Sequence, residues 1–473
     1  MTEETEYFDS EDFKEILRQY EESVKSGEHI YMDADDLTDI ADYYNYLNRN
    51  DEAEEAIALA TEYNPDAIGP MLYKARKALN AEDFETAEAY ADKVQVHDSL
   101  EAVYLRAEIL IKQGNIEESD KILSEYSKDV PTDEYADYVK VIIQLYLEYN
   151  EFLKAFEWTA RFTGSDNEEF QELMARTLFG MGKYMDSERL FNELLDKNPY
   201  SAEYWNALSG VQYMKQDYSG ALSSSEYALA INPDDADGLM SKANTLFTMD
   251  NYDEALIAFQ KYSEQKPDDE YGYLQQALCL INKGDYSEEG LELLRKAVSV
   301  SDVESIYLPE IYQEMSFVYN KLGNLDKALW CLDMLDKLDC DHVHLQVTRG
   351  HLLLNNKKEK EAKKEFDKAL KMSDNSPNTM LQIIVSYQDN MYLDYAYSLF
   401  LKLFNEVGDD WDEGYSYMAL CCNDLKKDDE FLYYLKKACN QNPTEAQMVL
   451  RDYFPEDMDP KDYYDYALIH LND

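Results

Sequence analysis

The sequence is short of basic residues for a chain of its length. Its 473 residues include 44 Lys and Arg against 98 Asp and Glu, which gives a net charge of −54. Nucleic acids and anionic membranes attract basic surfaces and repel acidic ones. The composition therefore predicts no binding to nucleic acid or to an anionic membrane. It favours a basic partner, although charge that only maintains solubility would give the same composition.

Cysteine is also scarce, and none of the six cysteines lies in a Cys-x-x-Cys pair or at the spacing of zinc ligands. We therefore expect free, buried thiols in a reducing compartment. No uncharged apolar stretch approaches the roughly 18 residues of a membrane span. The first residues also lack the basic and apolar regions of a signal peptide. The expected location is the cytoplasm.

The sequence motifs of catalysis are absent as well. The chain has no Gly-rich nucleotide loop, no Gly-x-Ser-x-Gly elbow and no His-Glu-x-x-His metal motif. His344 and His351 are seven residues apart, so they share a helix face two turns apart and would need further ligands to bind a metal. We expect no enzymatic activity, no metal and no cofactor.

Proline is scarce too, but its positions are informative. Dipeptides that end in proline recur 34 residues apart, at Pro199, Pro233 and Pro267, and Asn-Pro pairs also occur at Pro65 and Pro443. A fixed period of this length indicates one structural unit copied many times. Between two prolines, two segments with apolar residues at helical spacing flank a break, which predicts helix, turn, helix, stop. We align twelve such units, which begin near residues 34, 68, 100, 136, 168, 202, 236, 270, 309, 343, 377 and 412.

Small residues recur at two positions of the unit, where they allow two antiparallel helices to approach closely. Those in the first helix are Ala41, Ala75, Ala107, Ala175, Ser209, Ala243, Ala277, Ser316, Gly350 and Ala419. Those in the second helix are Ala53, Ala87, Ala155, Ala221, Ala255, Ala328, Ala362 and Ala396. Glycine is placed between the two helices at Gly114, Gly182, Gly284 and Gly323, where a helix end favours positive φ.

These residues resemble the tetratricopeptide repeat. Trp205, Leu208, Ala221, Ala228 and Pro233 match the family pattern within one unit. The resemblance implies an all-α, right-handed α-solenoid of about twelve helix-turn-helix units with terminal capping helices. Its expected domains are an N-terminal tail and capping helix (1–33), the repeat array (34–443) and C-terminal capping helices (444–473).

The units are interrupted at one place and capped at both ends. We expect a short insertion around residues 299–305, where the chain is longer than one period allows. Residues 11–26 predict an amphipathic capping helix. Near the other end, Thr444 and Gln447 have the spacing of a capping box, and Asp459 followed by proline predicts the start of a last helix.

In the family, first helices line a concave groove that binds a polypeptide. Carrying that arrangement over gives an apolar and aromatic set of candidate groove residues: Asn206, Tyr213, Met240, Asn244, Phe247, Leu274, Leu278, Ile281, Gln313, Phe317, Val347, His351, Leu354, Leu381 and Val385. The equivalent set in the earlier units is acidic: Asp35, Thr38, Asp42, Glu101, Tyr104, Glu108, Asp137, Glu169 and Glu172. Such a groove suits a partner with a basic segment and an apolar one. The alternative is that the apolar positions are covered by the chain itself.

The resemblance implies a scaffold or adaptor for another protein. A non-catalytic regulatory or substrate-recognition subunit of an enzyme or chaperone complex is the alternative. The clamp with which some family members grip an acidic C-terminal peptide is absent, because Leu173, Glu203 and Ala207 stand where its basic and amide residues belong. One stretch is basic: Lys357, Lys358, Lys360, Lys363, Lys364, Lys368 and Lys371. It predicts a solvated helix face or a docking site for an acidic partner or a second copy.

Overall fold

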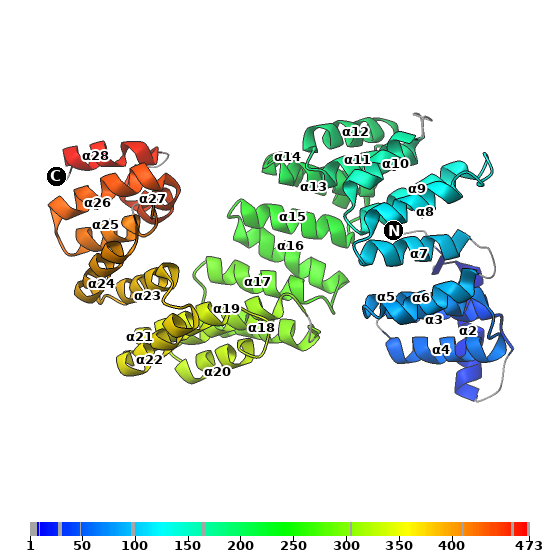
Figure 1. Cartoon of the computed structure of the whole chain (residues 1–473), viewed down its shortest axis with the longest axis horizontal. Helices are drawn as coiled ribbons and strands as arrows, with labels where there is room; N and C mark the ends of the chain where they lie inside the picture. Colours follow the sequence, from blue (N-terminus) through cyan, green and yellow to red (C-terminus); the bar gives the residue numbers. More distant parts are fainter. Residues whose placement is uncertain are drawn as a thin grey trace. The chain divides into compact units, whose positions relative to one another are not determined.

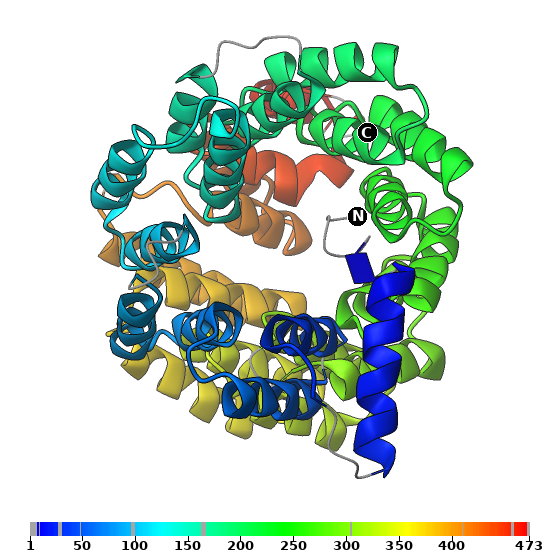
Figure 2. The same ribbon diagram turned by 90° about the vertical axis from the view of Figure 1, so that its right-hand side faces the viewer.

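The computed structural model describes residues 7–8, 10–26, 31–47, 49–95, 100–161, 167–302, 305–408, 410–455 and 458–470. Every secondary-structure element within these residues is a helix (Figures 1 and 2). The chain divides into two compact units, Met1–Ile231 (unit 1) and Asn232–Asp473 (unit 2). The three domain boundaries expected from the sequence and the hand of the superhelix stay predictions.

Within the described residues, twelve helical hairpins follow one another in sequence, as the period predicts. The first helices of the hairpins are α3 (Ala34–Tyr46), α5 (Ile68–Asn80), α7 (Leu100–Lys112), α9 (Tyr135–Glu148), α11 (Glu168–Gly180), α13 (Ala202–Met214), α15 (Ala236–Thr248), α17 (Glu270–Asn282), α19 (Leu308–Lys321), α21 (His342–Asn355), α23 (Pro377–Asp389) and α25 (Tyr415–Asp424). The second helices are α4 (Asn50–Tyr63), α6 (Phe84–Gln95), α8 (Ile116–Tyr126), α10 (Phe152–Arg161), α12 (Tyr184–Lys197), α14 (Tyr218–Ile231), α16 (Tyr252–Gln265), α18 (Glu288–Val300), α20 (Leu325–Leu335), α22 (Glu359–Met372), α24 (Leu393–Glu406) and α26 (Asp428–Gln441). α18 ends at Val300 and α19 begins at Leu308, which agrees with the short insertion expected around residues 299–305; residues 303 and 304 lie outside the described residues.

A left-handed residue ends the first helix of each hairpin whose turn the structure describes. The predicted glycines have φ between +72° and +79°. The other hairpins place a non-glycine residue there: Glu82, Asn150, Gln216, Asp250, Lys357, Met391 and Lys426. In α13 the turn is closed by hydrogen bonds from Gln216 N to Tyr213 O (2.8 Å) and from Asp217 N to Gln212 O (2.9 Å), the bonding pattern of a Schellman motif.

The small residues lie where the two helices of a hairpin meet. The predicted alanines at both positions are buried, with almost no exposed surface. Serine fills some of these positions because its hydroxyl finds a backbone partner across the hairpin. Ser209 Oγ donates to Ala221 O (2.8 Å) and Ser316 Oγ donates to Ala328 O (3.0 Å). A buried hydroxyl therefore stays hydrogen-bonded at a contact that admits only a small side chain.

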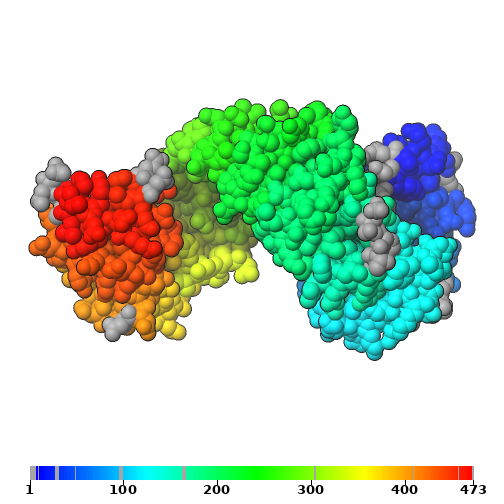
Figure 3. Space-filling model, turned by 90° about the horizontal axis from the view of Figure 1, so that it is seen from above, coloured from blue at the N-terminus to red at the C-terminus, as the bar shows by residue number. Residues whose placement is uncertain are grey.

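Capping helices close the described chain at both ends. At the N-terminal end, α2 (Glu11–Ser26) buries Phe13 and Tyr20, as its amphipathic pattern predicts. At the other end come α27 (Pro443–Leu450), the 3₁₀ helices η1 (Arg451–Tyr453) and η2 (Pro460–Asp462), and α28 (Tyr463–His470). The last of these, in red, lies at the surface (Figure 3).

The predicted capping box at Thr444 is wrong. The cap of α27 is Asn442, whose side chain accepts a hydrogen bond from Glu445 N (3.0 Å). Pro443 occupies the first helical position, where its missing N–H costs nothing, so the cap lies earlier in the chain than predicted. The other C-terminal prediction is confirmed, because the Asp459 side chain caps η2, which leads into α28.

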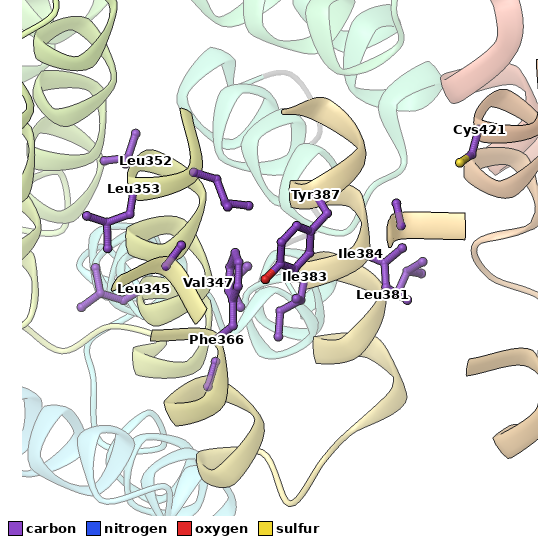
Figure 4. Close-up of a cluster of buried hydrophobic side chains, with 14 of the residues drawn as sticks. Leu345, Val347, Leu352, Leu353, Phe366, Leu381, Ile383, Ile384, Tyr387 and Cys421 are labelled. Atoms are coloured by element: carbon purple, nitrogen blue, oxygen red, sulfur yellow. The ribbon is translucent and has the colours of Figure 1, made fainter. Parts of the chain in front are cut away.

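The described part of unit 2 contains a continuous hydrophobic core, whose buried side chains run from Leu274 to Ala467. Part of it, around Val347, Phe366 and Tyr387, is drawn in Figure 4. In unit 1 the described buried side chains form separate smaller clusters. In both units each hairpin buries its apolar faces against its neighbours, as expected when no single repeat can cover its own surface.

Candidate functional site

The candidate site is a row of partly exposed side chains on successive first helices of unit 2. It consists of Met240, Asn244 and Phe247 on α15, Leu278 on α17, Gln313 and Phe317 on α19, His351 on α21, and Val385 on α23. We call this row the candidate face. Gln313 is exposed and the other members are buried or partly buried. Leu278, Phe317 and Val385 pack against the core from its edge.

Three predicted groove residues are core residues instead. Leu274, Val347 and Leu381 are 0%, 4% and 7% exposed, and they belong to the continuous core of unit 2. The same holds for Leu354, at 2% exposure. A first helix packs against its own second helix and also against the next hairpin, so two of its sides are apolar and buried. These four side chains present almost no surface to a partner. Asn206 is partly buried on α13 and lies in unit 1.

Aromatic pairs give the candidate face its largest apolar groups. The rings of Phe247 and Tyr252 meet edge to face with centroids 5.3 Å apart, and those of Phe317 and Tyr286 do so at 5.5 Å. Lys321 Nζ lies 5.1 Å from the centroid of the Phe317 ring, within the range of a cation–π contact. Each phenylalanine is therefore held in a defined orientation although it is not fully buried.

The tyrosines and the lysine of these pairs were not predicted as site residues. The contact of Phe247 with Tyr252 crosses the turn of one hairpin, five residues along the chain. The same spacing joins Phe179 to Tyr184 (5.8 Å) and Tyr213 to Tyr218 (5.5 Å) in unit 1. An aromatic pair at this spacing across a left-handed turn is the sequence signal that would have found Tyr252.

Amide side chains link neighbouring first helices beside the aromatic pairs. Tyr271 Oη donates to Asn244 Oδ1 (2.7 Å), which joins α17 to α15. Asn356 Nδ2 donates to Asn320 Oδ1 (2.7 Å), which joins the end of α21 to α19. Gln388 Nε2 donates to Tyr417 O (3.2 Å), which joins α23 to α25. Of these amides, Asn244 belongs to the candidate face, whereas Gln388 is buried and ties α23 to α25.

His351 is the titratable member of the candidate face. Burial lowers its pKa, nearby Lys321 lowers it further, and the carboxylate of Asp389 opposes both. The imidazole is therefore neutral at pH 7. Among the described residues there is no group of three His, Cys, Asp or Glu side chains able to hold a metal ion. The neutral ring is suited to hydrogen bonding and packing.

Much of the predicted acidic set in unit 1 is paired with basic side chains. Lys140 Nζ lies 2.8 Å from Asp137 Oδ1 and 2.6 Å from Glu169 Oε2. Arg176 Nε lies 2.8 Å from Glu172 Oε1, and Arg76 Nε lies 3.9 Å from Glu108 Oε2. Lys140 reaches Glu169, and Arg76 reaches Glu108, from a neighbouring first helix, which periodicity alone does not reveal. The first helices of unit 1 are therefore less negative than their carboxylates suggest.

A pocket of about 640 Å³ lies among α3, α4 and α5 of unit 1. Its lining carries both signs of charge, with Asp42 and Glu54 alongside Arg76 and Lys77. Lys77 Nζ and Glu54 Oε1 are 2.6 Å apart. Because charges of both signs line the pocket and Lys77 pairs with Glu54 within it, the pocket offers no concentrated charge of one sign. Across the described residues, no helix is both long and apolar enough to span a membrane.

Comparisons with known proteins agree on the kind of repeat. Models of the tetratricopeptide repeat match residues 173–236, 213–278 and 343–376. The first two segments together run from within α11 to within α17, and the third covers the hairpin α21–α22. No curated protein matches the chain.

Solved structures similar to parts of the chain include MamA, residue 41 to the end, from Desulfovibrio magneticus RS-1, with 18% identity and a TM-score of 0.34 over 37% of this chain and 96% of that one. A thermophilic tetratricopeptide repeat protein of Thermus thermophilus has 21% identity and a TM-score of 0.31 over 40% of this chain and 100% of that one. A tetratricopeptide repeat protein from Parabacteroides merdae ATCC 43184 has 14% identity and a TM-score of 0.39 over 53% of this chain and 96% of that one.

The family matches fall on hairpins whose small-residue contacts, left-handed turns and period are those of the repeat. Residues 173–278 and 343–376 are therefore tetratricopeptide repeats, and the described chain is an all-α array of helical hairpins of the kind found in protein-interaction scaffolds.

Proposed function

We propose that this protein is an adaptor that binds a polypeptide partner on the candidate face of unit 2. The partner segment is apolar or aromatic where it meets Phe247, Leu278 and Phe317. It lies in an extended or helical conformation along the row of first helices, because the row presents one set of side chains per hairpin. The partner also carries a basic segment in this proposal, because the net charge of the chain is −54.

The observation that carries this proposal is the pairing of Phe317 with Tyr286 and Lys321. A partly buried phenylalanine held by an aromatic neighbour and a cation loses little conformational entropy on binding. Rigid aromatic anchors of this kind are typical energetic centres of protein interfaces. The amide group of Asn244 stands three residues before Phe247 on α15 and can hydrogen-bond the backbone of a bound segment.

An affinity capture with two variants tests the proposal. The tagged protein and its Phe247→Ala/Phe317→Ala variant are incubated with a lysate, and bound polypeptides are identified by mass spectrometry. Trp330→Ala is the matched control, because Trp330 is an aromatic residue on the second helix α20 and is 48% exposed. We expect a stoichiometric polypeptide that is lost from the double variant and retained by the control.

Equal capture by all three proteins would refute the proposed face. Far-ultraviolet circular dichroism must show that the double variant keeps its helicity, because loss of helicity would assign the two phenylalanines to the core. A captured catalytic chain would select the alternative in which this protein is a subunit of an enzyme complex. Weaker capture at about 200 mM than at about 50 mM salt would support a basic partner segment, since exposed charge pairs are screened over about 10 Å or less.

A further inference from the structure

The helix α22 carries a stripe of lysines on its outer side. Its buried side consists of Ala362, Phe366 and Ala369, which are 0%, 2% and 0% exposed. A helix turns by about 100° per residue, so the side opposite these three residues carries the lysine stripe: Lys360, Lys364, Lys368 and Lys371. All four side chains belong to exposed residues.

The stripe is largely without compensating acid, although the chain has 98 carboxylates. Lys368 Nζ pairs with Glu365 Oε2 at 2.6 Å. In the described part of the chain, none of the ion pairs includes Lys360, Lys364 or Lys371. The successive lysines Lys360, Lys364 and Lys368 stand four residues apart, and like charges at this spacing destabilise a helix. Glu361 and Asp367 border the stripe, and a bound anion would further reduce the repulsion between its lysines.

We propose that the lysine stripe of α22 docks an acidic segment of a partner protein. Lys360, Lys364 and Lys368 are about 6 Å apart along the helix axis, at about 1.5 Å per residue, and Lys371 follows about 4.5 Å further on. Carboxylates on alternate residues of an extended chain repeat at about 6.6 Å, so a segment with Asp or Glu at every second position matches the stripe. Each carboxylate meets an ammonium group at the surface, where the charges of both partners stay partly hydrated.

A second copy of this chain is the less favourable occupant. Two copies would bring net charges of −54 together, whereas a short segment brings only the charges that meet the stripe. At physiological salt the Debye length is about 8 Å, so the segment responds to the lysines beneath it more than to distant carboxylates. This surface lies on a second helix, whereas the candidate face lies on first helices, so both can be occupied by one partner or by two.

Fluorescence anisotropy with a defined probe tests this assignment on the full chain. The probe is a fluorescein-labelled twelve-residue peptide of alternating Glu and Ser, and the peptide of alternating Gln and Ser is its neutral control. The stripe variant carries Lys360→Glu, Lys364→Glu and Lys371→Glu. The matched control carries Lys121→Glu, Lys128→Glu and Lys261→Glu, which are exposed lysines outside the stripe and change the net charge equally.

We expect the acidic peptide to bind the wild-type chain, and to bind more weakly at about 200 mM than at about 50 mM salt. The stripe variant should bind at least about tenfold more weakly, with the control variant close to wild type. An equal loss in both variants, or no binding of the acidic peptide to wild type at the lower salt concentration, would overturn the proposal. So would a dimer, seen by light scattering, that the stripe variant loses, because it would assign the stripe to a second copy. If the stripe variant unfolds, the triple Lys→Gln variant at the same positions gives the comparison.

Discussion

Replacement of Gly350 by alanine tests the closest approach of two helices in unit 2. Gly350 lies inside α21 at the small-residue position of its hairpin. A Cβ atom added there would lie 2.3 Å from Cε1 and 2.6 Å from Cδ1 of Phe366 on α22. The Phe366 side chain is 2% exposed, and its ring centroid lies 5.3 Å from that of Tyr387. The ring therefore lies among other buried side chains, which resist its displacement (Figure 4).

Two opposing effects set the size of the change. Overpacking of a well-packed core costs roughly 1–3 kcal/mol. Alanine in place of glycine inside a helix stabilises the folded state by roughly 0.5–1 kcal/mol. The free energy of unfolding should therefore fall by about 1–2 kcal/mol, which lowers the Tm of a unit of this size by roughly 2–8 °C.

Urea and thermal unfolding followed by circular dichroism measure this change. Gly210→Ala is the matched control, because Gly210 also lies inside a first helix but an added Cβ would have no atom within 4 Å. The free energy of unfolding of the Gly210→Ala variant should rise by about 0.5–1 kcal/mol. In a Phe366→Leu background the smaller side chain leaves space for the added Cβ, so Gly350→Ala should lower the free energy of unfolding by less than it does in the wild-type background. This difference would show that the two positions are energetically coupled.

A Gly350→Ala protein as stable as wild type would refute the reasoning. It would mean that α21 and α22 are farther apart than the contact of Gly350 with Phe366 requires. The same result for Gly210→Ala and Gly350→Ala would show that only helix propensity matters at both positions.

Three further changes have expected outcomes. Met391→Gly should raise the free energy of unfolding by about 0.5–1 kcal/mol, because Met391 has φ +65° and a left-handed non-glycine residue costs roughly 1–2 kcal/mol. Gly182→Ala should lower the free energy of unfolding, because Gly182 has φ +72°. Equal urea midpoints for the two variants would contradict both expectations. Glu445→Ala should lower the free energy of unfolding by about 1–3 kcal/mol and speed hydrogen exchange at the start of α25. The reason is that the Glu445 carboxylate accepts hydrogen bonds from two backbone N–H groups there. Unchanged exchange rates would show that these two hydrogen bonds are dispensable. The folded-state pKa of His351 lies below its unfolded value, so the unfolded chain binds more protons between the two values, and the free energy of unfolding should fall as the pH is lowered below about 6.5. Urea titrations at several pH values should show that the His351→Gln variant lacks this part of the pH dependence. Identical pH profiles for wild type and variant would exclude a contribution from His351.

The hairpins were predictable because their signals are local. Helical spacing, a small residue in each helix and a turn residue of positive φ all lie within one 34-residue unit, so Ala221, Gly182 and Pro233 could be placed without knowledge of distant contacts. The predicted cap at Thr444 failed for a local reason as well, since a proline at the first helical position moves the cap to Asn442.

The candidate site was predictable only in part. Spacing within one helix places Phe247, Leu278 and Phe317 on one side, and these side chains are partly exposed. It does not show which apolar side the next hairpin covers, so Leu274, Val347 and Leu381 were assigned to the groove although they are buried. Tyr286 was missed because it reaches Phe317 from another hairpin, and Lys321 because its contact is with a ring rather than with an acid.

The sequence by itself determined the all-helical class, the twelve hairpins and the two kinds of capping helix, because each depends on residues close together along the chain. Only the tertiary structure decided which apolar residues remain partly exposed, which acidic residues of unit 1 are paired with Lys140, Arg176 and Arg76, and which lysines of α22 are left without an ion pair. The physical reason is that burial and ion pairing depend on which hairpins are neighbours in space. The 34-residue period predicts each hairpin, but it does not predict which side chains of the neighbouring hairpins contact it.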